Sequence, residues 1–210
     1  MVKAEEVKRI IQAGKAAPEG KYQEYGVLVP LIETAEGCCV VLETRASTLK
    51  RQPGEISLPG GKKEKNETPL EAAIRETSEE LSIPKTDISV FGPLDYLVTP
   101  FNYIIYPFVG EIKKERVGCI KAAPDEVDEV FTVPLDFFLE TLPENYPVGI
   151  KVQIPRSFPF ELIPNGEAYN WRSGTYPVYF YSYNGRIIWG ITARILKNLA
   201  DRLNGPKQEA

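Results

Sequence analysis

Residues 61–83, GKKEKNETPLEAAIRETSEELSI, decide how the chain is interpreted. Small and apolar side chains recur in this stretch at helical spacing: Leu70, Ala73, Ile74, Thr77 and Leu81. At about 100° per residue they share one face about 100° wide, which we expect to pack against a sheet. The spacing therefore predicts a helix over about residues 68–81, and Pro84 ends it.

Three glutamates lie on one flank of this helix. Glu76 and Glu80 are about 40° apart beside the apolar face, and Glu79 is about 60° further out. Like charges at this spacing destabilise a helix by roughly 0.2–0.5 kcal/mol per pair, so a compensating cation is expected. Hard cations such as Mg²⁺ or Mn²⁺ prefer carboxylate oxygens and also bind phosphate oxygens. The alternative is a solvated acidic face.

Neighbouring residues favour a metal or phosphate site over the solvated face. Gly60 and Gly61 lack a Cβ, so a backbone amide or carbonyl there can come close to a metal or a phosphate. Arg75 can pair with a carboxylate and fix its orientation, and Glu79 is within helical reach of it.

Composition bounds the remaining possibilities. A chain of 210 residues is long enough for one domain, 1–210, with a substantial core. The net charge of -4 argues against a broad nucleic-acid surface. There is no histidine, which excludes Ser-His-Asp, Cys-His and histidine-metal chemistry. Acid-base work therefore falls to carboxylates, Lys, Tyr or metal-bound water.

Cysteine spacing and hydropathy indicate the cellular compartment in which the protein is expected. The three cysteines fit neither a disulfide framework nor zinc-ligand spacing, and we expect reduced core thiols. No run approaches the roughly 20 apolar residues that span a bilayer, and the acidic, polar start does not read as a signal peptide. We expect a cytoplasmic protein without membrane contact.

The rest of the chain alternates strand-like and helix-like patterns. We expect a packed N-terminal helix over about residues 2–13 and a C-terminal helix over about 187–203. Expected strands cover residues 25–31, 38–43, 56–58, 88–98, 103–112 and 127–133. Residues 155–183 suit short strands and ordered loops. Mixed strands with a few helices indicate the α+β class.

The spacing of residues 61–83 resembles the Nudix box, G-x5-E-x7-R-E-U-x-E-E-x-G-U, where U is apolar. Seven residues match at every interval: Gly61, Glu67, Arg75, Glu76, Glu79, Glu80 and Ile83. Thr77 replaces an apolar residue, and Ser82 replaces the glycine after the helix, where a left-handed conformation would disfavour serine. The resemblance implies the Nudix fold, a mixed β-sheet sandwiched between α-helices. It also implies a loop-helix-loop, residues 61–83, that binds Mg²⁺ or Mn²⁺.

Residues 42–61 resemble the motif of the coenzyme A branch of this family, L-L-T-x-R-[SA]-x3-R-x3-G-x3-F-P-G-G. Matching residues are Arg45, Ala46, Gly54 and Pro59-Gly60-Gly61, whereas Val41, Glu43, Lys50 and Leu58 depart from it. Coenzyme A carries a 3′-phosphate besides its pyrophosphate, so its binder needs additional cations. Arg45, Lys50 and Arg51 are the candidates, with a solvated basic loop as the alternative.

The resemblance also assigns roles within the site. Glu76 and Glu80 would bind metal, with Glu79 and the Gly60 or Gly61 carbonyl completing the site or holding water molecules. Glu67 would order Arg75 or a metal-bound water. The general base is left open between Glu79, Glu126 and Glu129.

The expected activity is metal-dependent hydrolysis of coenzyme A or its thioesters to phosphopantetheine and adenosine 3′,5′-bisphosphate. Two alternatives stand beside it: a Nudix hydrolase of ADP-ribose, NADH, other dinucleotides or nucleoside triphosphates, and a non-catalytic domain that senses a nucleotide. The expected partner is a small nucleotide and not a nucleic acid. A homodimer is left open.

Overall fold

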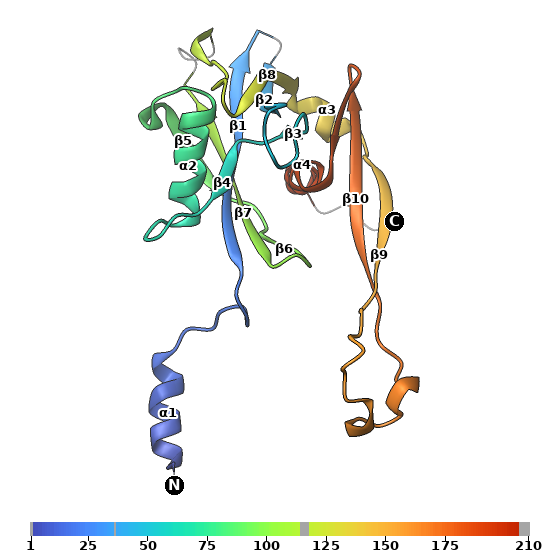
Figure 1. Ribbon diagram of the computed structural model, residues 1–210. Coiled ribbons are helices and arrows are strands. Elements are labelled where there is room, and N and C mark those ends of the chain that lie inside the picture. Colours follow the sequence, from blue (N-terminus) through green and yellow to red (C-terminus); the bar gives the residue numbers. More distant parts are fainter. Residues whose placement is uncertain (1, 36, 114–117, 206–210) are drawn as a thin grey trace.

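The computed structural model describes residues 2–35, 37–113 and 118–205, which form two sheets and several helices (Figure 1). The larger sheet contains β1 (Gln23–Thr34), β2 (Gly37–Arg45), β3 (Ile56–Ser57), β4 (Gly60–Lys62), β5 (Ile88–Pro93), β6 (Leu97–Val98), β7 (Tyr103–Ile112) and β8 (Val127–Pro134). The smaller sheet contains β9 (Glu144–Ile150), β10 (Gly174–Tyr183) and β11 (Arg186–Trp189). The helices are α1 (Ala4–Ala13), α2 (Pro69–Glu80), α3 (Leu135–Glu140) and α4 (Gly190–Leu203).

Strand β1 is the centre of the larger sheet. It pairs in parallel with β7, from Gln23 opposite Tyr103 onward, and antiparallel with β2 and β4. The sheet is therefore mixed, as expected. Pairing of Val27 with Gly60 places the two glycines of β4 directly beside β1.

Both faces of this sheet are buried. Along β2, Val40 and Leu42 belong to a large core that includes residues of α4, β10 and β11. The alternate residues Cys39 and Val41 belong to a second cluster with Leu81, just after α2. Helices α2 and α4 therefore cover opposite faces, and the predicted α+β class with a mixed sheet between helices is confirmed.

Helix α2 begins and packs as the local sequence dictates. Thr68 accepts a hydrogen bond from the Glu71 amide while the Glu71 carboxylate accepts one from the Thr68 amide, and Pro69 opens the first turn. The helix lies so close to β1 that a Cβ on Gly26 would be 1.8 Å from the Pro69 carbonyl oxygen. Only glycine at position 26 allows this contact. The helix predicted over residues 68–81 is confirmed to within a residue.

The N-terminal helix forms close to its expected bounds, but it does not pack. None of the residues of α1 is buried, and Figure 1 shows the helix standing clear of both sheets. Its apolar residues Val7, Ile10 and Ile11 are 48%, 59% and 70% exposed. The expectation of a packed helix is therefore wrong. The extended stretch between α1 and β1 contains Pro18 and carries the helix away from the core.

The C-terminal helix begins three residues later than predicted. Residues 186–189 form β11 instead, in which Ile188 pairs with Tyr181 of β10. Asn184 and Gly185 join the two strands with φ values of 48° and 78°. Asn-Gly at a two-residue turn is a strong hairpin signal, and the helical spacing of the isoleucines concealed it.

The expected strand over residues 88–98 is divided into β5 and β6. The pairing of β5 with β7 shifts register between Val90 and Gly92, and the Leu94 amide donates to the Pro107 carbonyl beyond the end of β5.

Of the three free cysteines, Cys39 is buried and Cys119 is exposed, so the expectation of core thiols is wrong for Cys119.

Residues 155–183 contain turns and a strand, as expected. Together with β9 they form a long hairpin that extends well past the larger sheet (Figure 1). Near its tip Phe158 and Trp171 meet edge to face, with ring centroids 5.6 Å apart.

Among the described helices, none has the length and apolar character needed to cross a membrane.

Replacing Ser82 with glycine should stabilise the protein. Ser82 follows α2 with a φ of 53°, and the Ile83 amide donates back to the Ser78 carbonyl, as in a left-handed helix end. Relief of this conformation should raise the free energy of unfolding by about 0.5–1 kcal/mol in urea denaturation. Ser89→Gly in extended β5 is the control and should lower it. A loss of stability in Ser82→Gly would contradict the interpretation.

Candidate active site

The glycines of β4 form one wall of an acidic site. A Cβ on Gly61 would be 2.2 Å from the carboxyl carbon of Glu76, so that position has room only for glycine. The Gly60 amide donates to Glu80 Oε2 at 2.9 Å. Sequence analysis assigned a carbonyl of Gly60 or Gly61 to the site, and the structure instead directs the amide of Gly60 at a carboxylate.

Three carboxylates come together beyond this wall. Single oxygens of Glu76, Glu80 and Glu126 all lie within 4.8 Å of one another. Glu126 comes from the loop before β8, and that loop is hydrogen-bonded to the end of α2 through the Ala123 amide and the Glu80 carbonyl, 3.0 Å apart. An all-oxygen donor set at this spacing fits a hard divalent cation.

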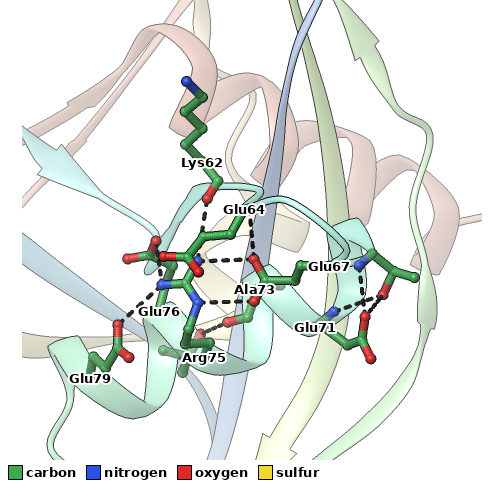
Figure 2. Close-up of polar contacts among 10 residues, drawn as sticks. Lys62, Glu64, Glu67, Glu71, Ala73, Arg75, Glu76 and Glu79 are labelled. Atoms are coloured by element: carbon green, nitrogen blue, oxygen red, sulfur yellow. Dashed lines mark hydrogen bonds and ion pairs between the residues drawn. The ribbon is translucent and has the colours of Figure 1, made fainter.

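Arg75 orders the outer side of the cluster, as Figure 2 shows. Its Nε and Nη2 donate to the two oxygens of Glu67 at 2.9 and 3.1 Å. Its Nη1 donates to Glu76 at 2.8 Å and to Glu79 at 3.2 Å. The two-pronged partner is therefore Glu67, and Glu79, which sequence analysis named as the pair within reach, is the weaker contact.

Glu79 lies apart from the three converging carboxylates. Its side chain is 56% exposed, whereas that of Glu76 is 18% exposed. Sequence analysis named Glu79 with Glu76 and Glu80 as metal ligands; among the described residues, the group of carboxylates close enough to share a cation contains Glu126 beside Glu76 and Glu80. Glu129 accepts hydrogen bonds from both terminal nitrogens of Arg186 at 2.8 Å. Of the three proposed bases, Glu126 alone belongs to the cluster.

Burial and like charge raise the proton affinity of the site. Glu80 is 3% exposed, and burial followed by the charge of Glu43 raises its pKa. Burial likewise raises the pKa of Glu43, against a hydrogen bond from Ser57 that lowers it. The pKa of Glu76 is raised by burial and lowered by Arg75. Before any cation binds, the buried carboxyl groups therefore hold protons to higher pH than free carboxyl groups do.

Sequence reasoning missed Glu43, which appeared only as a departure from the coenzyme A motif. The alternation of residues along a strand could have identified it. Glu43 follows Cys39 and Val41 at intervals of two, which places it on the face of β2 that lies under α2.

The basic loop between β2 and β3 lies beside the acidic cluster. The Ala46 amide donates to the Glu126 carbonyl at 2.9 Å, and the Arg45 amide donates to the Glu55 carbonyl at 2.9 Å. Arg45 Nε is buried and has no hydrogen-bond partner among the described residues. Lys50 and Arg51 are exposed on the same loop. This region therefore offers one buried donor, Arg45 Nε, and two exposed cations, Lys50 and Arg51.

Comparison with known proteins places the chain in a family. The NUDIX domain model matches residues 23–151, more than half of the chain. The chain belongs to the Nudix family. It is therefore a hydrolase that acts on pyrophosphate bonds, as predicted.

Two curated relatives are similar to this chain. The Nudix hydrolase NudL of Photorhabdus laumondii is 29% identical over 178 residues, which cover 84% of this chain and 83% of that protein. The peroxisomal coenzyme A diphosphatase NUDT7 of Mus musculus is 36% identical over 119 residues, 55% of this chain and 49% of that protein. This chain thus spans about half of the mouse enzyme.

Among solved structures, the crystal structure of RenU, a Nudix hydrolase from M. smegmatis, aligns with a TM-score of 0.46 at 19% identity. The alignment covers 56% of this chain and 74% of that one.

The metal-free protein should lose stability as the pH rises. Because the pKa of Glu80 is raised from 4.5, the folded state keeps a proton that the unfolded state releases above about pH 5. Glu80→Gln should flatten this fall and stabilise the metal-free protein at about pH 8 by on the order of 1 kcal/mol. Urea denaturation in chelator across the pH range measures both slopes. Exposed Glu111→Gln is the control, and equal slopes in wild type and Glu80→Gln would reject the explanation.

Proposed function

We propose that this Nudix hydrolase cleaves the pyrophosphate of coenzyme A or its thioesters with Mg²⁺ or Mn²⁺, giving phosphopantetheine and adenosine 3′,5′-bisphosphate. The main observation behind this proposal is a backbone hydrogen bond between the loop that matches the coenzyme A motif and a residue of the acidic cluster. The Ala46 amide donates to the backbone carbonyl of Glu126. The likeness to the mouse coenzyme A diphosphatase supports the same substrate.

In this proposal Glu76, Glu80 and Glu126 hold the divalent cation. When bound, the cation supplies positive charge that offsets the pyrophosphate oxygens and favours attack by water. Arg75 fixes the Glu76 carboxylate, and the Gly60 amide fixes that of Glu80. Glu67 acts through Arg75.

The proton acceptor is Glu126 or Glu79. Both carboxylates belong to or border the cluster, whereas Glu129 is occupied by the two-pronged pair with Arg186. A carboxylate held by two charged hydrogen bonds is a weak base. The proposal therefore leaves Glu129 out of the chemistry.

Arg45, Lys50 and Arg51 would recognise the phosphates that are not cleaved. The orphaned Nε of Arg45 lies on the loop next to the cluster, where a phosphate oxygen would satisfy it. Lys50 and Arg51 lie further out on the exposed loop and suit the 3′-phosphate. A small nucleotide is thus the proposed partner.

A second candidate is hydrolysis of another nucleoside diphosphate derivative, such as ADP-ribose or NADH. Lys50 and Leu58, which depart from the coenzyme A motif, favour it. A non-catalytic sensing domain is less well supported, because every carboxylate of the Nudix box is present. A cytoplasmic location, a single domain over residues 1–210 and a homodimer stay predictions.

Glu76→Gln should reduce turnover of coenzyme A at least about 100-fold, because a neutral amide is a poor ligand for a hard cation. The fold should persist, since glutamine keeps the size of the side chain and an oxygen for Arg75. Initial rates with Mg²⁺ and with Mn²⁺, together with thermal unfolding, measure both effects. Exposed Glu33→Gln is the control. Near wild-type turnover in Glu76→Gln would sink the assignment.

Removing the loop cations should weaken binding of coenzyme A selectively. The double variant Lys50→Gln/Arg51→Gln should raise KM for coenzyme A by about 10–100-fold, the range for lost hydrogen bonds to a charged group. It should change KM for 3′-dephospho-coenzyme A and ADP-ribose much less, because neither carries the 3′-phosphate. The matched control is Lys8→Gln/Arg9→Gln on α1, an adjacent exposed Lys-Arg pair. Equal losses on all three substrates would contradict recognition of the 3′-phosphate.

A further inference from the structure

Strand β8 is irregular where it runs beside the basic loop that joins β2 to β3. β8 and β2 pair residue by residue up to Glu129, which lies opposite Thr44. The next pair joins Val127 to Arg45, so Asp128 is an extra residue without a partner in the ladder. A bulge of this kind turns a side chain out of the regular alternation and is common next to active sites. The Asp128 carboxylate is therefore free to meet the loop.

That carboxylate holds the start of the basic loop. Asp128 Oδ2 accepts a hydrogen bond from the Ser47 amide at 2.9 Å. The preceding amide, that of Ala46, donates to the Glu126 carbonyl at 2.9 Å. Among the described residues, no other hydrogen bond joins residues 46–55 to a part of the chain outside β2 and the loop itself. Two consecutive amides thus anchor the loop to the beginning of β8 and the residue before it.

The anchor sets the direction in which the loop leaves β2. The Leu49 amide donates to the Ala46 carbonyl at 3.1 Å, so a tight turn follows directly. Lys50 and Arg51 come next, and both residues are exposed. Neither makes an ion pair with another described residue. Their positions therefore depend on the backbone of the loop, and so on its anchor at Asp128.

Asp128 makes no other hydrogen bond or ion pair with a described residue. It is exposed, so it does not fill the core. The neighbouring Glu129, by contrast, binds Arg186 through both carboxylate oxygens. An ionised carboxylate accepts a stronger hydrogen bond from an amide than a neutral oxygen does. The contact with the Ser47 amide is thus the one interaction that explains an aspartate at this bulge.

We propose that Asp128 is a positioning residue for substrate recognition: it fixes the Ser47 amide and so holds the two exposed cations of the loop where they bind a phosphate that is not cleaved. This inference rests on the proposed function. Asp128 itself touches neither the substrate nor a cation, and it acts only through the backbone of the loop. Its removal should therefore weaken binding of the substrate without changing the chemical step.

Kinetics of two variants test this role. Asp128→Ala should raise KM for coenzyme A about tenfold, the effect of one lost hydrogen bond to a charged group, with kcat unchanged. KM for 3′-dephospho-coenzyme A should change much less, because that substrate lacks the phosphate proposed for the loop. Asp128→Asn keeps an oxygen that can accept from the Ser47 amide, and its KM for coenzyme A should stay close to that of the wild type. Exposed Asp125→Ala, in the loop before β8, is the matched control.

Ser47→Pro removes the donor of the same hydrogen bond instead of its acceptor. Position 47 is the second residue of the turn that the Ala46 carbonyl and the Leu49 amide close, and proline is favoured there. This variant should therefore keep the turn and raise KM for coenzyme A as Asp128→Ala does. It also decides the question if Asp128→Ala does not fold. In hydrogen exchange, the Ser47 amide should be protected in the wild type and exchange faster in Asp128→Ala.

The role of Asp128 is overturned by an unchanged KM, an equal rise in KM for both substrates, or a fall in kcat in Asp128→Ala. If the wild type turns over no coenzyme A, the proposed function fails instead. Calorimetry with adenosine 3′,5′-bisphosphate then decides the role of Asp128, because that nucleotide also carries the 3′-phosphate. A roughly tenfold loss of affinity in Asp128→Ala supports the role, and equal affinity overturns it.

Discussion

Helix α2 lies on β1 at a distance that only glycine permits, and the active site depends on that contact. A Cβ on Gly26 would meet the backbone of α2, and a Cβ on Gly61 would meet the side chain of Glu76. Because the helix is held so close, its carboxylates point across β4 toward β2 and the loop before β8. A small outward shift of α2 would separate Glu80 from the Gly60 amide and dissolve the cluster.

The charges of the site are arranged in two zones. On the outer side Arg75 binds Glu67, Glu76 and Glu79, so negative charge there is largely matched within the protein. On the inner side Glu43 and Glu80 are both buried, and among the described residues their carboxylates accept hydrogen bonds only from the Ser57 hydroxyl and the Gly60 amide, respectively. Within the protein, negative charge is therefore matched by arginine on the outer side, whereas on the inner side burial raises the pKa values of Glu43 and Glu80.

Sequence reasoning succeeded where a pattern is local and failed where partners are distant. Helix α2 and the left-handed conformation of Ser82 at its end follow from residues close together in the sequence. The spacing of the box also names its glutamates. It could not show that Glu126 joins them, because that depends on the loop hydrogen-bonded to the end of α2. Ile188 was misassigned because its helical spacing competed with the turn at Asn184, and the turn determined the structure.

Strand β2 links the metal site to substrate recognition. Glu43 and Arg45 lie two residues apart on β2, so in the proposed function one strand would carry both a buried carboxyl group near the acidic cluster and a cation for the substrate phosphates. The Ala46 amide also donates to the carbonyl of Glu126, in the loop just before β8, and β8 pairs with β2. A substrate that pulls the loop therefore also moves a carboxylate of the cluster. In the proposed function, recognition of the nucleotide and the geometry of the candidate cation centre would therefore be coupled.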